Sequence, residues 1–264
     1  MTEKYNEKSI ASYMAKLPPA FYFFDEIDST NEELKRRASS GAPCGTLVAA
    51  NHQSAGKGRM GRSFYSPADT GIYMSILLRP ALDFSEGVLI TTAASVAVCR
   101  AIERCADVSC TIKWVNDVLI GDKKVCGILT EAVMCAGSAV PDNIVLGIGI
   151  NITTGVFPED IAGRAGAVSD SLPDGQRDCS LRSALTAAVY EEVMRQAEDL
   201  TSRGFMEEYR RRSDVLGKMI SYGSKDNWTK ARALDIDKDG GLIVEREDGD
   251  IITLSTGEIS LRKE

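Results

Sequence analysis

Apolar residues along this chain follow two patterns, short runs bounded by Gly, Asp or Pro and longer stretches without turn residues. Short bounded runs are typical of β-strands, whereas a long apolar stretch is typical of a buried helix. The Ala-rich stretch at 86–105 is of the second kind, and we predict a helix there. Because both patterns occur throughout the chain, it is expected to mix helices and strands.

A second helix is predicted directly after the first strand. Ser29 and Glu32 have the spacing of a capping box, and Gly41 is a suitable helix stop, so we place a helix at 29–40. We predict strands at 21–27, 46–50, 72–78, 108–114, 118–120, 125–134 and 143–152, and helical structure at 181–209 with a break near Gly204.

The pattern changes after Asp214. Strand-like runs at 218–222, 231–235, 242–245 and 251–254 are separated by Gly or Asp turns. Short, evenly spaced strands of this kind predict a small all-β barrel. We therefore expect an α+β protein with a large domain at 1–213 and a small β-barrel domain at 214–264.

Composition narrows the possible functions. The 264 residues carry a net charge of −7, with 44% hydrophobic and 26% charged residues, which are ordinary globular values. The negative charge argues against nucleic-acid binding by the whole chain. We find no apolar stretch long enough for a signal peptide or a membrane span. Seven cysteines without a C-x-x-C, and His52 as the one histidine, indicate reduced cytoplasmic thiols rather than a zinc site.

Residues 56–62 concentrate three glycines and three cations in this acidic protein. Glycine allows positive φ and lets backbone N–H groups approach a ligand, and the cations favour a phosphate or carboxylate. Gly56, Gly58 and Gly61 also spell the dinucleotide fingerprint, but Pro67 and a strand follow where that fingerprint needs a helix. Kinase H-R-D and D-F-G motifs are absent from the sequence. A solvated turn with incidental charges is the alternative.

Two strand ends carry further candidate residues. Alternation along a strand puts Gly147, Gly149 and Asn151 on one face, leaving room for a ligand, or for a closely packed element. Residues 113–117 gather a cation, an aromatic ring, an amide and a carboxylate at a strand end, which suits a site or a surface ion pair beside a core tryptophan. Lys124 follows the next turn, where a lone lysine usually faces solvent.

Taken in order, these motifs resemble the catalytic domain of biotin protein ligases. The matching segments are 29–31, Gln53 with 56–62, 113–117, 124–129 and 147–151, and residues 257–262 resemble the end of the family's C-terminal domain. The resemblance runs from about residue 21 to the last residues. It implies a large mixed-sheet catalytic domain of the biotin/lipoate ligase fold, followed by a small SH3-like β-barrel.

The resemblance also implies a reaction. Such enzymes form biotinyl-5′-adenylate from biotin and ATP with Mg²⁺, then transfer biotin to a specific lysine of a biotin carboxyl carrier protein or domain. Carried over by position, the catalytic residues are Arg59, Lys124 and Lys57. Residues expected to bind substrate are Ser29, Thr30, Asn31, Gln53, Gly56, Lys57, Gly58, Arg59, Trp114, Lys124, Gly127 and Gly149. Asn116, Asp117 and Asn151 are expected on the nucleotide and metal side, without a fixed protein-only metal site.

Two features depart from the full family pattern. Val115 stands where the family has proline, which frees φ and restores a backbone N–H. The catalytic pattern starts near residue 21, so we expect the form without the N-terminal DNA-binding module. The expected protein is a cytoplasmic monomer or weak homodimer that binds neither nucleic acid nor membrane. Lipoate ligases and octanoyltransferases, a binding module without turnover, and a DNA-binding regulator are the alternatives.

Overall fold

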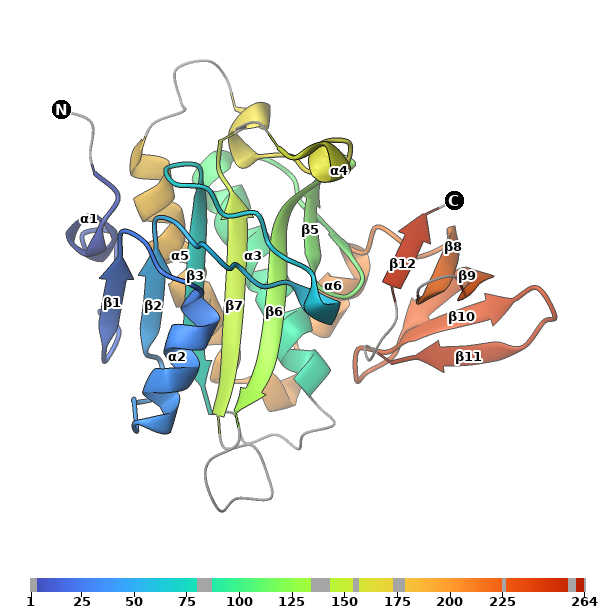
Figure 1. The fold of residues 1–264 in the computed structure, drawn as a ribbon. Coiled ribbons are helices and arrows are strands. Elements are labelled where there is room, and N and C mark those ends of the chain that lie inside the picture. Colours follow the sequence, from blue (N-terminus) through green and yellow to red (C-terminus); the bar gives the residue numbers. More distant parts are fainter. Residues whose placement is uncertain are drawn as a thin grey trace.

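The structure is a computed structural model, and it describes residues 4–79, 87–133, 143–153, 157–172, 179–224, 227–255 and 260–263. These residues form a seven-stranded sheet flanked by helices and a separate five-stranded sheet near the carboxyl end (Figure 1). The α+β class and the change of character after Asp214 are as predicted.

The large sheet has the order β1-β2-β3-β7-β6-β5-β4. The β1–β2 pair is parallel and the other pairs are antiparallel, so the sheet is mixed. In chain order the strands are β1 (Phe21–Phe24), β2 (Leu47–Ala50), β3 (Gly71–Leu78), β4 (Thr111–Lys113), β5 (Asp117–Ile120), β6 (Lys123–Val133) and β7 (Asn143–Asn151).

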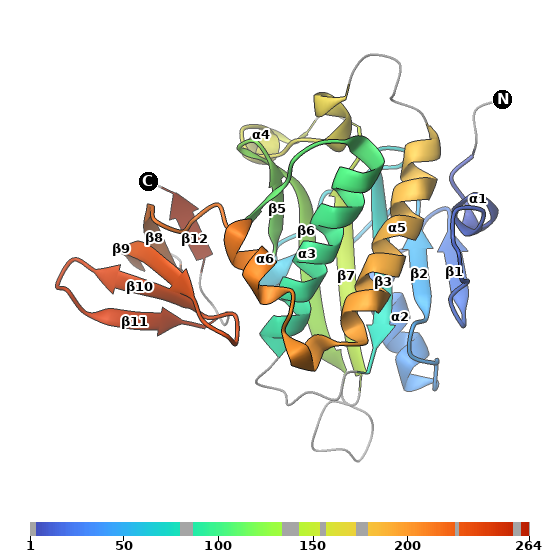
Figure 2. The same ribbon diagram turned by 180° about the vertical axis from the view of Figure 1, so that it is seen from behind.

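Helices cover the two faces of this sheet unequally. The long helices α3 (Gly87–Ala106) and α5 (Cys179–Ala197) pack across one face, with α6 (Met206–Arg211) beside them (Figure 2). The main hydrophobic core lies between these helices and the sheet. On the opposite face lie the shorter α2 (Thr30–Ser39) and the glycine-rich loop (Figure 1). The face covered by few elements is therefore the one that can hold a ligand.

The carboxyl-terminal sheet is entirely antiparallel, with the order β11-β10-β9-β8-β12. Its alternating burial in β9 is typical of strands with one face packed on a core. It lies beside α6, on the side of the large sheet where β5 and the edge strand β4 lie (Figures 1 and 2). Its strands are β8 (Met219–Ser224), β9 (Asn227–Ile236), β10 (Leu242–Arg246), β11 (Ile251–Leu254) and β12 (Ser260–Lys263).

Several boundaries differ from the sequence prediction. The strand expected at 108–114 is reduced to β4, since Asp107 has a φ of 51° and the chain turns before it can pair. The helical region at 181–209 breaks between Ala197 and Met206, an interval that contains Gly204 as predicted, and a 3₁₀ turn (Leu200–Ser202) and left-handed Arg203 also lie there. The sequence reading missed α1 (Glu7–Ala11), α4 (Glu159–Ala162) and β12. Residues 86, 134 and 257–259 of the predicted segments lie outside the described residues.

Ser29 is the N-cap of α2 as predicted, but the capping box does not form. The Ser29 side chain makes no capping hydrogen bond. Glu32, the expected partner, instead binds Lys35 at 2.8 Å and Lys57 at 2.6 Å. Glu32 therefore forms ion pairs with two lysines instead of a capping hydrogen bond with the backbone of Ser29. Ser29 is buried and lines the pocket described below. Of the described helices, none is long and apolar enough to cross a membrane.

Candidate active site

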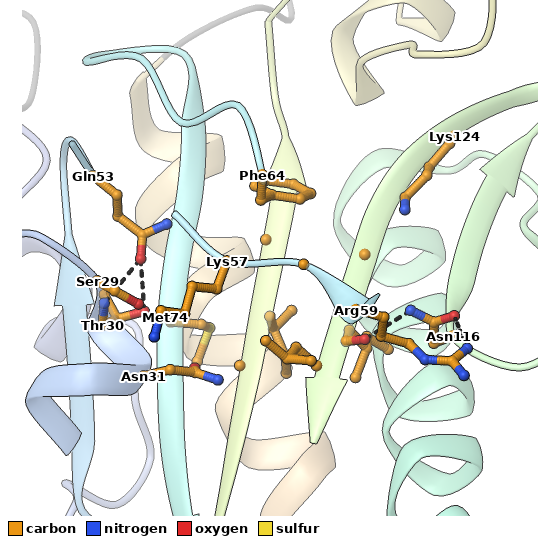
Figure 3. Close-up of a pocket in the computed structure, with 17 residues that line it drawn as sticks. Ser29, Thr30, Asn31, Gln53, Lys57, Arg59, Phe64, Met74, Asn116 and Lys124 are labelled. Carbon is orange, nitrogen blue, oxygen red and sulfur yellow. Dashed lines mark hydrogen bonds between the residues drawn. The ribbon is translucent and has the colours of Figure 1, made fainter. Parts of the chain in front are cut away.

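A pocket opens on the sheet face that carries α2 and the glycine-rich loop (Figure 3). Its floor comes from β3, β7 and β6, and its walls come from α2, the loop and the start of β6. The structure brings together most residues expected from the sequence: Ser29, Thr30, Asn31, Gln53, Lys57, Gly58, Arg59, Asn116, Lys124, Gly127 and Gly149 all line it.

One end of the pocket is a group of neutral hydrogen-bonding side chains. The Thr30 backbone N–H and hydroxyl donate to Gln53 Oε1 at 2.9 and 3.1 Å (Figure 3). The Gln53 amide then donates to Ser66 Oγ at 3.0 Å, and Oγ of the buried Ser75 lies 2.8 Å from Thr30 Oγ1. Because these partners fix each other, this end presents a preorganised polar surface without net charge.

Asn31 ties this polar end to a chain of charges. It accepts a hydrogen bond from Ser75 Oγ at 2.5 Å and donates to Glu131 Oε2 at 2.8 Å. Lys35 bridges Glu131 and Glu32, and Glu32 also holds Lys57 of the loop. The hydrogen bonds from Lys35 first, and from Lys57 second, lower the pKa of Glu32 below its ordinary 4.5. Lys57 is thus anchored to α2 while its stem lines the pocket.

The floor is a strip of glycines, as the alternation in β7 predicts. A Cβ on Gly147 would lie 2.2 Å from Asn31 Oδ1, and one on Gly149 would lie 2.4 Å from Phe64 Cε1. Gly127 pairs with Gly149 across the β6–β7 ladder and also borders the Phe64 ring. The missing side chains therefore make room for an amide and an aromatic ring in this structure.

Arg59 lies on the opposite side of the pocket from Gln53 (Figure 3). Met60 with φ 59° and Gly61 with φ 70° turn the loop around it. Its guanidinium Nη1 donates to Asn116 Oδ1 at 3.1 Å, and the Asn116 amide donates to Ile128 O at 2.8 Å. Burial lowers the pKa of the Arg59 guanidinium, while nearby Asp117 acts in the opposite direction. Arg59 is thus a partly desolvated cation aimed by an amide.

Lys124 is a second cation at this end. Its ammonium lies 2.6 Å from Asp117 Oδ1, and its side chain is 35% exposed. The backbone of Lys124 is held by segment 157–172, because its N–H donates to Arg164 O at 2.8 Å and its carbonyl accepts from Gly166 N at 3.0 Å. Lys124 therefore lines the pocket and is paired with Asp117, which differs from the solvated lysine usual at such a position.

Four predicted residues lie outside the pocket lining. Gly56 supports the loop, since a Cβ there would lie 2.5 Å from Phe64 O. Asp117 forms the ion pair with Lys124 described above. Asn151 donates to Gly166 O at 3.0 Å, and Trp114 donates to Gly240 O at 2.9 Å, away from the pocket. The Trp114–Val115 peptide bond is cis.

The sequence reading did not select six lining residues as site residues. Gly147 had a signal, because alternation already placed it on the glycine face. The others carry no signal that separates a pocket wall from the core, since apolar side chains occur equally in both. They are Phe64, Met74, Ile128, Leu129 and Ile148. Among the described residues, no group of His, Cys, Asp and Glu side chains has the makeup of a metal site.

The pocket joins a neutral polar end to a cationic end across a narrow glycine floor. Such a shape suits a ligand with a hydrogen-bonding head and an anionic tail. Residues 23–151 match the Biotin/lipoate A/B protein ligase family, and residues 215–262 match the Biotin protein ligase C terminal domain. Fold, pocket and matches together define a protein ligase of the biotin and lipoate class.

Individual relatives make the assignment more specific. The Bifunctional ligase/repressor BirA of Bacillus spizizenii is 32% identical over 233 residues, 85% of this chain and 69% of its own length. The Biotin--[acetyl-CoA-carboxylase] ligase of Mycobacterium tuberculosis is 31% identical over 246 residues, 89% of this chain and 86% of its own. The biotin protein ligase of Aquifex aeolicus in complex with biotin and ATP superposes with a TM-score of 0.75 at 27% identity, covering 93% of this chain and 100% of that one. The chain belongs to the biotin protein ligase family.

Proposed function

We propose that this enzyme forms biotinyl-5′-adenylate from biotin and ATP, and then transfers biotin to a lysine of a biotin carboxyl carrier protein or domain. One observation carries the proposal. The neutral cluster around Gln53 and Thr30 faces the cations Arg59 and Lys124 across the glycine floor. A biotin molecule has the matching polarity, with a neutral ureido ring at one end and a carboxylate at the other.

In the first step the carboxylate oxygen of biotin attacks the α-phosphorus of ATP, and pyrophosphate leaves. The reaction brings two anions together, so catalysis depends on cations placed where the negative charge meets. Arg59 and Lys124 are proposed to neutralise the carboxylate and α-phosphate, and Lys57 to contact the phosphates from the loop. Magnesium bound to the phosphates would supply additional charge neutralisation.

In the second step the neutral amine of the acceptor lysine attacks the mixed anhydride. An amide bond forms, AMP leaves, and the amine gives up a proton. Before that attack, water must be kept from the same carbonyl. We propose that the glycine-rich loop does this, and the contacts of Lys57 with Glu32 on α2 and of Arg59 with Asn116, on opposite sides of the pocket, support the proposal.

Further proposals concern the setting of the reaction. We assign the catalytic unit to residues 1–213 and the small domain to residues 214–264, with Asn116, Asp117 and Asn151 toward the nucleotide. Cys44, Cys99, Cys105, Cys110 and Cys126 are free thiols, which supports a reducing compartment such as the cytoplasm. The carrier domain of a carboxylase is the proposed acceptor, and the proposed solution state is a monomer or weak homodimer without affinity for nucleic acid.

Isotope exchange between pyrophosphate and ATP tests the first step without an acceptor. We expect exchange that requires biotin and Mg²⁺ and that is at least about 10²-fold slower with lipoate or octanoate, since unpaired polar groups in the Gln53 cluster would penalise an apolar chain. Exchange supported equally by lipoate would assign the chain to the other branch of its class. Biotin binding without exchange would identify a binding module instead.

A further inference from the structure

The geometry points to Trp114 as a positioning residue through which the carboxyl-terminal domain holds Arg59 in place. The kinetic part of this inference rests on the proposed function. None of the described residues that line the pocket belongs to the carboxyl-terminal sheet. The domain is nevertheless connected to the pocket by a short series of hydrogen bonds that runs from Gly240 through Trp114 and Asn116 to Arg59.

The route starts at the turn between β9 and β10. Trp114 is 5% exposed, and its indole N–H donates to Gly240 O at 2.9 Å. Gly240 has a φ of 87°, and a Cβ there would lie 2.8 Å from Val88 Cγ1. The turn therefore sits directly against the first turn of α3, at a distance that only glycine permits.

This turn is rigid and is held to the large domain by further contacts. Asp237 Oδ1 accepts hydrogen bonds from Asp239 N at 2.9 Å and from Gly241 N at 2.8 Å. An ion pair joins Asp239 to Arg203 at 3.0 Å, and Arg210 Nε donates to Ile236 O at 2.6 Å. The Gly240 carbonyl is thus presented to Trp114 by a preorganised element.

Trp114 lies two residues before Asn116, and hydrogen bonds hold the backbone at Val115 and at Asn116. Tyr209, which is fully buried on α6, donates its hydroxyl hydrogen to Val115 O at 3.0 Å. Asn116 O accepts from Ile128 N at 3.1 Å, and its amide orients Arg59. A displacement of Trp114 would therefore be passed to Asn116 and from there to the guanidinium.

The position of the Arg59 guanidinium matters, because a charged group stabilises a transition state only when it is directed at the charge that develops there. A guanidinium aimed by an amide before substrate binds does not have to reorganise during the reaction. Loss of the indole donor leaves the Gly240 carbonyl buried without its partner, so the turn and Trp114 would separate. The fold would remain, but Arg59 would lose its fixed direction.

Trp114→Phe tests this inference because it keeps an aromatic side chain and removes the N–H donor. We expect adenylate formation to slow about tenfold, at unchanged KM for biotin. In the Arg59→Ala background the same substitution should add no further loss, since both changes would act on one group. Hydrogen exchange of segment 57–64 should also rise in Trp114→Phe, and this readout does not depend on which substrate the enzyme uses.

Tyr190→Phe is the matched control, because it removes an equally buried hydroxyl donor to a backbone carbonyl, Gly45 O at 2.9 Å. Tyr190→Phe should lower the melting temperature about as much as Trp114→Phe does, but leave the adenylation rate and the hydrogen exchange of segment 57–64 unchanged.

Should Trp114→Phe not fold, Asp239→Asn supplies a milder change at an exposed residue of the β9–β10 turn, and it is expected to slow adenylation severalfold. Losses that multiply with Arg59→Ala, or a Trp114→Phe variant that behaves like Tyr190→Phe, would overturn the inference. Without any adenylate from wild type the proposed function fails, while the exchange comparison still decides the structural coupling.

Discussion

Replacing Arg59 by alanine should separate catalysis from stability. The substitution removes the 3.1 Å hydrogen bond from the charged guanidinium to Asn116, a kind of bond worth about 1.5–3 kcal/mol. It also removes a cation whose pKa is lowered by burial, so the folded state no longer bears the desolvation cost. These terms oppose each other, and we expect the free energy of unfolding to change by less than about 1 kcal/mol. For a chain of this size that is about 2–4 °C in melting temperature.

The effect of the same substitution on the rate should be much larger. Removing a preorganised electrostatic group costs about 10²–10³ in rate, or about 2.7–4 kcal/mol in the activation barrier. Single-turnover formation of biotinyl-adenylate, followed by mass spectrometry, measures it alongside thermal unfolding. Arg62→Ala is the comparison variant, because it removes a cation that is exposed on the same loop and outside the pocket lining, so its rate should fall less than that of Arg59→Ala. An Arg59→Ala protein that unfolds, or one that adenylates at the wild-type rate, would refute the assignment.

Three further changes probe other parts of the site and fold. Lys124→Gln should slow adenylation about 10²-fold but impair transfer from supplied biotinyl-adenylate less, because the two anions are already joined; equal losses in both steps would contradict this. Gly147→Ala places a Cβ 2.2 Å from Asn31 Oδ1, so Asn31 should turn away and KM for biotin should rise about tenfold in steady-state assays. The pKa of Glu103 is raised by burial but lowered more by its hydrogen bonds, mainly from Arg212, so it ends below 4.5 and stabilises the fold above that pH. Glu103→Gln should cost about 1 kcal/mol at pH 7, with a difference from wild type that vanishes as the pH falls through the lowered pKa of Glu103, as denaturant titrations at each pH can check.

Much of the fold follows from patterns that are local in sequence. The glycine alternation in β7 predicted a bare strip on one face, and the short runs after Asp214 predicted a small all-β domain, where the structure has a five-stranded sheet. Boundaries were less predictable, because they depend on tertiary contacts. The strand expected at 108–114 is one case, since only β4 (Thr111–Lys113) pairs there.

The residues of the candidate site also fall into those that a local sequence pattern predicted and those whose place depends on tertiary contacts. The glycines and cations of the loop were recognisable in the sequence because three of each occur within seven residues of an acidic protein. Phe64 did not stand out, because its place over Gly149 depends on the folded path of the loop. Trp114 was expected to bind substrate, yet its indole faces Gly240 of the other domain. The sequence alone does not distinguish an aromatic residue that touches the ligand from one that supports a neighbouring residue of the site.

The most direct test of the proposed function is to identify the product of the first step. The protein would be incubated with ATP, Mg²⁺ and an equimolar mixture of biotin, lipoate and octanoate, and the acyl adenylates analysed by mass spectrometry. A carrier domain added afterwards would report the mass gained by its lysine. We predict biotinyl-adenylate as the dominant adenylate and a biotin amide on the lysine. A lipoyl or octanoyl adenylate as the main product, or no adenylate at all, would contradict the proposed function.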